Sequence, residues 1–334
     1  MTIKDIAKLS GYGIGTVSRV LNNHPDVSDK ARKKIMAVIE ESNFQPNTNA
    51  RHLKRQSVSS LAIIVKGNQN MLFADILEKM QMFLSRNGET AEVSYIDEDA
   101  NEVECALSLC RDRNPKGIIF LGGNLDYFGE EFRNIEAPCV LITNNASSLN
   151  ISNLSSIYTD DEEASYQLIN YLIRNGHSKI GVIGGTLSTT QISSSRYKGC
   201  LRGFEENDID FDEKNGYIPC RFSMEDGYQA TKKLLRQMPD VTAIMAISDT
   251  IAVGAMRAIC DAGKRVPDDI SVVGFDGISL SNYCIPRLTT IRQDTDRMAV
   301  EGVDLMLRQI HYPDDGRDTS IPFQLVERES VKKM

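Results

Sequence analysis

Two short apolar periods, separated by a break that contains glycine, open the chain. Their apolar residues are Ile3, Ile6 and Ala7 in the first period and Val17, Val20 and Leu21 in the second. The i, i+3, i+4 spacing places each set on one face of a helix. Residues 10–13 (Ser-Gly-Tyr-Gly) favour a turn, in which Gly11 can adopt a positive φ angle. The pattern predicts a helix-turn-helix whose second helix, at about residues 14–22, has the form that enters a DNA major groove; two ordinary surface helices are the alternative.

A third helix is expected to complete this head. Ser28 is a good N-cap residue for it. The apolar residues that follow at helical spacing are Ala31, Ile35, Val38 and Ile39. Residues 1–45 are therefore predicted to form an all-α head of three short helices.

Residues 46–59 carry little apolar surface. Pro46 suits the first turn of a short helix, but Ala50 and Leu53 are almost its whole apolar face. A helix this short is only marginally stable by itself. The segment is predicted to be a hinge linker that becomes helical only when something holds it.

From residue 60 the chain alternates apolar runs with helical periods. Strands are predicted at 61–65, 91–96, 116–121, 138–143, around 157, 179–183, 216–220, 243–247 and 271–275, and helices at 73–87, 102–113, 165–174, 195–207, 224–237 and 250–262. Continuous apolar strands between helices indicate parallel sheets that are covered on both faces. The alternation of strands and helices occurs in two successive series, which predicts an α/β region of two doubly wound lobes. A ligand cleft is expected at the carboxyl ends of the strands.

Charge is distributed unevenly between these regions. Residues 1–59 hold ten Lys and Arg against five Asp and Glu, which leaves 28 against 41 for the other residues. A basic head favours DNA, because neutralising phosphates provides most of the non-specific affinity; a solvated basic face is the alternative.

Composition restricts the compartment and the cofactors. No stretch reaches the roughly 18 consecutive apolar residues of a membrane span, and the N-terminus lacks the layout of a secretion signal. The seven cysteines are odd in number and show no Cys-x-x-Cys spacing, which favours reduced thiols in a cytoplasm. Neither a metal site nor a cofactor is expected.

Several motifs in order along the chain resemble those of the lactose/galactose-repressor family. They include Thr2-Ile-Lys-Asp-Ile-Ala, Thr16-Val-Ser-Arg-Val-Leu-Asn22, Arg174-Asn-Gly-His-Ser-Lys-Ile-Gly181, Arg196-x-x-Gly199, Ser248-Asp249, Ala252-x-Gly-Ala255, Val266-Pro-Asp-Asp-Ile-Ser-Val-Val-Gly-Phe-Asp276 and Leu288-Thr-Thr-Ile291. The resemblance implies a homodimeric transcription factor, most simply a repressor, with a periplasmic-binding-protein-like effector domain at 60–334. It implies three crossovers between lobe 1 (about 60–160 and 291–320) and lobe 2 (about 161–288 and 321–334).

The same resemblance implies a set of DNA contacts. Arg19 matches a recognition-helix position where arginine commonly reads a guanine, and Leu53 matches a wedge that enters the minor groove. The other expected contacts are Thr2, Ile14, Gly15, Thr16, Ser18, Asn22, Arg51 and Lys54. Ile14 and Gly15 depart from the family pattern, because one offers only apolar contact and the other has no side chain. The operator is expected to be palindromic.

The resemblance also implies an effector site, for which a sugar or sugar derivative is the expected ligand. The residues that match effector positions are Phe73, Asp160, Arg196, Phe222, Ser248 and Asp276. A carboxylate and a guanidinium can hold the hydroxyls of a sugar or the edge of a purine.

Three alternatives to an effector-controlled repressor follow from the sequence. A regulator controlled mainly by a protein corepressor is the first. An enzyme with an appended DNA-binding head is the second, although neither a nucleophile-elbow nor a phosphate-loop motif is present. A plain solute-binding protein is the third, and the basic head argues against it.

Overall fold

The computed structural model describes residues 3–21, 26–42, 60–187, 192–313 and 316–334. Contacts divide the chain into two units, residues 1–59 and 60–334. The predicted hinge, 46–59, lies outside the described residues. Among the expected DNA contacts, Arg51, Leu53 and Lys54 belong to this hinge. Thr2 and Asn22 also lie outside the described residues.

The head consists of three helices, α1 (Ile3–Ser10), α2 (Ile14–Leu21) and α3 (Asp29–Glu41). Its buried apolar residues come from all three helices and the loop before α3: Ile6, Ala7, Val17, Val20, Val27, Ala31 and Ile35. Gly11 adopts a φ of 74° in the turn between α1 and α2, where its amide donates to the Ala7 carbonyl oxygen at 3.0 Å. The Ala31 amide donates to Ser28 Oγ at 3.4 Å, so Ser28 caps α3 as predicted. The predicted helix-turn-helix is confirmed.

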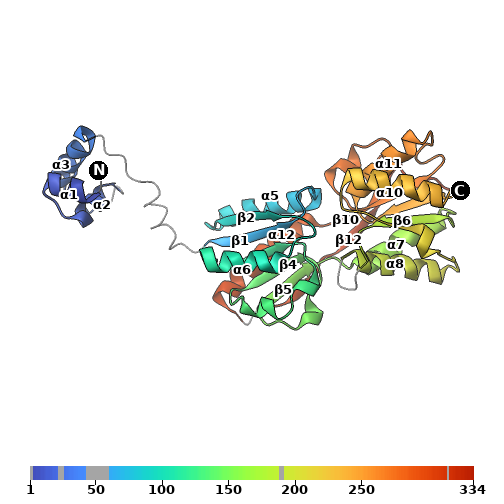
Figure 1. Cartoon of the computed structure of the whole chain (residues 1–334), viewed down its shortest axis with the longest axis horizontal. Helices are drawn as coiled ribbons and strands as arrows, with labels where there is room; N and C mark the ends of the chain where they lie inside the picture. Colours follow the sequence, from blue (N-terminus) through green and yellow to red (C-terminus); the bar gives the residue numbers. More distant parts are fainter. Residues whose placement is uncertain (1–2, 22–25, 43–59, 188–191, 314–315) are drawn as a thin grey trace. The chain divides into compact units, whose positions relative to one another are not determined.

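Lobe 1 is a six-stranded parallel sheet with helices on both faces (Figure 1). Its strands are β1 (Leu61–Lys66), β2 (Ala91–Ile96), β3 (Ile118–Leu121), β4 (Cys139–Thr143), β5 (Leu154–Tyr158) and β11 (Asp318–Ser320), in the order β11-β5-β4-β3-β1-β2. Strand β1 alternates between two cores. One contains Leu61, Ile63 and Val65 with α5 (Met71–Arg86) and α12 (Thr295–His311), and the other contains Ala62 and Ile64 with α6 (Glu102–Arg113).

Lobe 2 repeats this plan around a second six-stranded sheet. Its strands are β6 (Ile180–Gly184), β7 (Tyr217–Pro219), β8 (Ala243–Ala246), β9 (Ser271–Asp276), β10 (Thr289–Gln293) and β12 (Phe323–Val326), in the order β12-β10-β9-β8-β6-β7. Strand β12 is antiparallel to β10. Its helices are α7 (Asp161–Arg174), α8 (Ile192–Glu206), the short α9 (Glu213–Gly216), α10 (Met224–Gln237) and α11 (Asp249–Asp261). The predicted fold class, an all-α head with two doubly wound parallel-sheet lobes, is confirmed.

The chain passes three times between the lobes. The crossings lie between β5 and α7, between β10 and α12, and between β11 and β12. The second crossing falls after Gln293, beyond the expected boundary at 291, because β10 pairs with β9 and β12 in the lobe 2 sheet. No helix or strand was predicted after residue 275, so β10, α12, β11 and β12 are elements that the sequence pattern did not predict.

Helices α7 and α8 approach each other very closely at a glycine. A Cβ atom added at Gly199 would lie 2.0 Å from the Glu162 carbonyl oxygen and 2.9 Å from Ser165 Cβ. The glycine therefore sets the spacing of the two helices. Arg196 is one turn before it on α8, so this spacing also decides how near Arg196 lies to α7.

We predict that Gly199→Ala lowers the free energy of unfolding by about 1–3 kcal/mol, because the methyl group must push α8 away from α7. Gly129→Ala is the matched control, since no atom lies within 4 Å of an added Cβ there. Urea denaturation of the three proteins measures the difference. Equal stability of the two variants would contradict the close approach.

His177 ties the last residues of the chain to lobe 2. The imidazole is buried, with Nδ1 3.0 Å from Thr242 Oγ1 and Nε2 3.0 Å from the Lys332 carbonyl oxygen. A carbonyl oxygen only accepts, so Nε2 carries a proton and donates. Burial lowers the pKa of His177, and the hydrogen bond to Lys332 opposes that effect.

A pH dependence of stability follows from this lowered pKa. Between the folded value and the unfolded value of about 6.5, the unfolded chain binds more protons at this site. The contribution of His177 to the free energy of unfolding is therefore present above pH 6.5 and decreases as the pH falls. We expect the loss of stability between pH 7 and pH 5 to be smaller in His177→Gln than in the wild type, as urea titrations at both pH values would measure. An identical loss in both proteins would contradict the assignment.

Candidate functional site

Helix α2 presents an exposed face to solvent. Val17 and Val20 are buried in the head, whereas Ile14, Gly15 and Arg19 are exposed. Thr16 and Ser18 are partly exposed on either side of the buried Val17. Five of the expected DNA contacts thus lie on accessible parts of one helix, as a recognition helix requires.

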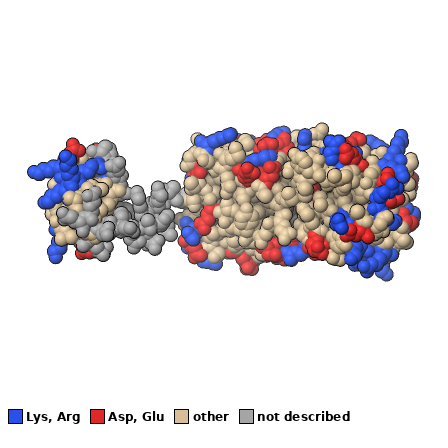
Figure 2. All heavy atoms as spheres, turned by 90° about the horizontal axis from the view of Figure 1, so that it is seen from above, with Lys and Arg blue, Asp and Glu red and all other residues tan. Residues whose placement is uncertain are grey.

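All three helices of the head carry basic side chains. The described ones are Lys4, Lys8, Arg19, Lys30, Arg32, Lys33 and Lys34. Figure 2 shows a concentration of Lys and Arg on the visible face of the head. Such a surface attracts phosphate oxygens whatever the base sequence.

A cavity of about 440 Å³ lies between the two lobes, at the carboxyl ends of the parallel strands. Phe73, Arg196, Phe222 and Asp276, four of the six expected effector residues, line it. Phe73 is in the first turn of α5 in lobe 1, and Phe222 lies between β7 and α10 in lobe 2. Each ring lies over a glycine: a Cβ added at Gly122 would be 2.7 Å from the Phe73 ring, and one at Gly185 would be 2.9 Å from the Phe222 ring. An aromatic residue therefore faces the cavity from each lobe.

Arg196 forms a buried network of contacts at the wall of the cavity. Its Nε donates to Asp161 Oδ1 at 2.7 Å, and its Nη2 lies 3.3 Å from Asp276 Oδ1. The guanidinium carbon is 3.7 Å from the centroid of the Phe275 ring. Arg196 also donates to the Ile247 carbonyl oxygen. Only 3% of Arg196 is exposed, so these contacts hold the guanidinium in one orientation at the wall of the cavity.

Burial changes the acidity of both carboxylates that pair with Arg196. It raises the pKa of Asp161 to about 6, while the charge of Arg196 opposes the increase. It also raises the pKa of Asp276, which accepts from Gln293 Nε2 at 2.9 Å. Both carboxylates nevertheless accept hydrogen bonds here, Asp161 from Arg196 and Asp276 from Gln293.

Asp276 adopts a left-handed backbone conformation, with φ at 108°. The buried Asp249 accepts from the Ile278 amide at 2.9 Å and from Thr290 Oγ1 at 2.6 Å, which supports the turn after Asp276. Thr143, which ends β4 and lines the cavity from lobe 1, has a φ of 89°. Strained residues of this kind persist only where surrounding contacts hold them, and they cluster at binding sites.

Asp160 and Ser248, the other two expected effector residues, lie outside the lining of this cavity. The Asp160 carboxylate caps α7 by accepting from the Glu163 amide at 3.0 Å. The Ser248 hydroxyl caps α11 by accepting from the Ile251 amide at 3.2 Å. Both side chains therefore serve the helices that begin at the cleft. The carboxylate that reaches Arg196 belongs to Asp161, the next residue after Asp160.

None of the polar residues that line the cavity from lobe 1 was predicted from the sequence. Asn124 and Asn144 line the cavity there, and Asn144 Nδ2 donates to the Gly123 carbonyl oxygen at 3.1 Å. The buried Glu102 forms an ion pair with Lys66 and accepts from the Asn124 amide. The available signal was a polar residue within three positions of the strand end, Asn124 after β3 and Asn144 after β4, because both strands end at the cavity.

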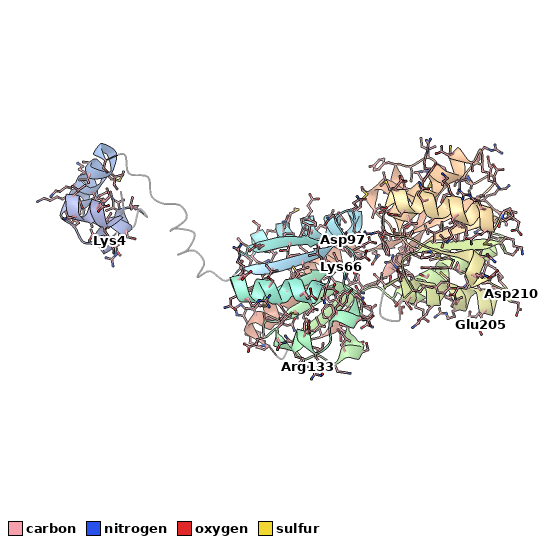
Figure 3. The ribbon with its side chains drawn as sticks, viewed as in Figure 1. Lys4, Lys66, Asp97, Arg133, Glu205 and Asp210 are labelled. Atoms are coloured by element: carbon pink, nitrogen blue, oxygen red, sulfur yellow. The ribbon has the colours of Figure 1, made fainter. Side chains whose placement is uncertain are left out.

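Ionic contacts join the lobes at the edge of this cavity. Arg221, just after β7 in lobe 2, lies 2.6 Å from Asp97 Oδ1 and 2.9 Å from Glu98 Oε1, both after β2 in lobe 1. Figure 3 shows Lys66 and Asp97 together at the end of the lobe 1 sheet that faces lobe 2.

The arrangement is suited to binding rather than to covalent chemistry. Aromatic faces, amides, carboxylates and a fixed guanidinium converge on one cavity, which is the composition of a small-molecule site. No group of His, Cys, Asp or Glu that could hold a metal occurs among the residues that the structure describes. Within the same residues, no helix is long and apolar enough to cross a membrane.

Known proteins with similar sequences and structures are DNA-binding regulators. Residues 2–47 match the family described as bacterial regulatory proteins, lacI family, and residues 169–331 match a periplasmic binding protein-like domain. The chain is 35% identical over 333 residues to the HTH-type transcriptional regulator MalR of Clostridium butyricum, with 99% of each chain covered.

Two solved structures are similar over 99% of both chains. One is the lac repressor dimer bound to operator and the anti-inducer ONPF, at 27% identity and a TM-score of 0.72. The other is the complex of the transcriptional regulator CelR with cellobiose, at 25% identity and a TM-score of 0.73. Since the similarity to MalR runs through both the helix-turn-helix head and the two lobes, the chain belongs to the lacI family of bacterial regulatory proteins.

Proposed function

We propose that the protein is a transcriptional repressor whose affinity for operator DNA is controlled by a sugar bound between its lobes. One observation carries the proposal: the chain combines an exposed recognition helix with a cavity in which Arg196 and Asp276 are held 3.3 Å apart. The first can read bases and the second can hold hydroxyl groups.

Arg19 is the proposed base-reading residue. It is exposed on α2, and a guanidinium can donate two parallel hydrogen bonds to the O6 and N7 atoms of guanine. Thr16 and Ser18 are proposed to contact phosphates, which fixes register without reading sequence. Ile14 offers an apolar contact, for which a thymine methyl group is the fitting partner.

A sugar is the proposed class of effector. Hydroxyl groups can donate to Asp276 and accept from Arg196, while the apolar face of a sugar ring fits against Phe73 or Phe222. A regulator with a similar chain was solved with cellobiose, and a second, from Enterococcus faecium, with ribose. A sugar that binds one cleft geometry better than another shifts the population between them by its difference in affinity.

The proposed assembly is a cytoplasmic homodimer on a palindromic operator. One three-helix head reads half of such a site, so tight binding needs two heads. The similar lac repressor was solved as a dimer on its operator. Within this proposal the protein is not an enzyme, and Leu53 of the hinge enters the minor groove.

Removing the base contact tests the DNA part of the proposal. We predict that Arg19→Ala weakens binding to the cognate operator by about 1–3 kcal/mol and relaxes specificity at one base pair, because the bidentate contact is lost. Titration of the operator and of single-base variants, at one salt concentration, measures both effects. Equal weakening on every sequence would show instead that Arg19 contacts only phosphate.

Removing the Asp276 charge tests the effector part. We predict that Asp276→Asn weakens sugar binding at least about tenfold, which corresponds to one hydrogen bond to a charged group, and leaves operator binding without sugar unchanged. Calorimetry on the DNA-free protein and operator titration with and without the sugar are the measurements. Asp160→Asn makes the same change at a helix cap outside the cavity lining and should keep the sugar response. A response that survives in Asp276→Asn would contradict the site.

A further inference from the structure

The side chains that line the cavity carry more negative than positive groups. Three cationic residues line it: Lys66, Arg196 and Arg221. Five carboxylates line it with them: Asp97, Glu98, Glu225, Asp226 and Asp276. The lining therefore carries an excess of negative charge, which disfavours an anionic ligand unless one of the three cations is free to pair with it.

Lys66 and Arg196, the two cationic side chains of the lining that are least exposed, already form ion pairs. Lys66 Nζ pairs with Glu102 and donates to the Ala100 carbonyl oxygen at 2.8 Å, and it lies 4.9 Å from the centroid of the Tyr127 ring. Arg196 lies between Asp161 and Asp276. Because both ion pairs are buried, an anionic ligand would have to displace a carboxylate from its partner or add a further negative charge beside it.

The outer cation, Arg221, is surrounded by acidic residues of the opposite lobe. Asp97, Glu98 and Asp99 are consecutive in the chain, and their carboxylate oxygens lie 2.6, 2.9 and 3.6 Å from the Arg221 guanidinium. Glu98 also accepts from the Phe222 amide at 3.3 Å, which extends the contact to the proposed stacking residue. A phosphate or carboxylate ligand near Arg221 would meet three like charges at once.

Residues 188–191 lie outside the described residues, and their sequence, Ser-Thr-Thr-Gln, contains neither lysine nor arginine. The uncharged polar residues of the lining are numerous: Asn68, Gln69, Asn70, Asn124, Thr143, Asn144, Ser193 and Ser223. Amides and hydroxyls both donate and accept, as recognition of neutral hydroxyl groups requires.

We propose that the cleft selects an uncharged sugar and rejects sugar phosphates and sugar acids, because its cations are paired and Asp97–Asp99 repel a ligand anion. This inference rests on the proposed effector function and narrows its ligand class. Specificity of this kind comes from a repulsive element that acts against the wrong ligand.

A panel of charge-matched sugars tests the selection. Calorimetry on the DNA-free full-length protein would compare glucose with glucose 6-phosphate and glucuronate, ribose with ribose 5-phosphate, and cellobiose with cellobionate. We expect at least one neutral sugar to bind, and to bind about tenfold or more tightly than its anionic counterparts, the difference that one unfavourable charge contact produces.

A variant that releases Arg221 tests the reason for the selection. Asp97→Asn combined with Glu98→Gln removes the two nearest carboxylates and keeps the shape of both side chains. We expect it to bind the anionic form of the selected sugar about tenfold more tightly than the wild type does, because Arg221 becomes available to the anion. The matched control is Asp268→Asn combined with Asp269→Asn, two carboxylates that pair with Arg265 outside the cavity lining, and it should change nothing.

The outcomes separate this inference from the function on which it rests. An anionic sugar that binds the wild type as tightly as its neutral parent would overturn the charge selection and leave the effector function standing. No gain of anion affinity in the double variant would overturn the role given to Asp97 and Glu98. If no sugar of the panel binds, the effector function is contradicted, and the charge selection is overturned with it.

Discussion

The buried contact between Arg196 and its two carboxylates is the interaction on which the cleft depends. Arg196 comes from α8, Asp161 from the first turn of α7 and Asp276 from the end of β9, so the contact joins three elements of lobe 2. Removing Arg196 would leave two buried carboxylates without a counter-charge, a loss of the kind that costs about 3–5 kcal/mol. The charge network therefore holds the wall of the site in one geometry before any ligand arrives.

Close packing makes that contact possible. Without a side chain at Gly199, α8 lies against the Glu162 carbonyl at the start of α7, which keeps Arg196 within 2.7 Å of Asp161. The left-handed conformations of Thr143 and Asp276 occur at strand ends that line the cavity, one in each lobe. The spacing of α7 and α8, the two strand ends and the paired charges thus all shape the same cavity. Arg221 joins the two lobes through an exposed ionic contact, which is weaker than the buried contact of Arg196.

Local patterns predicted much of this arrangement. The predicted bounds of the strand at 91–96 and of the helices at 102–113 and 224–237 agree with the structure, because each has a clear apolar period with turn or cap residues at its ends. Strand β10 was missed because Thr289–Gln293 has no continuous apolar run. Helix α12 did carry a signal that the prediction left unused, since Met298, Ala299, Val303, Leu305 and Met306 are apolar residues buried at helical spacing.

By itself, the sequence determined the helix-turn-helix, the two rounds of strands and helices, and the basic head, since spacing and composition along the chain specify them. The resemblance predicted Arg196 and Asp276 as effector residues, but only the tertiary structure decided which residues they contact. It placed Asp161 rather than Asp160 against Arg196, and made Ser248 a helix cap. Neighbours in sequence point in different directions from the start of a helix, and which of them meets a residue 35 positions away depends on how closely two helices pack.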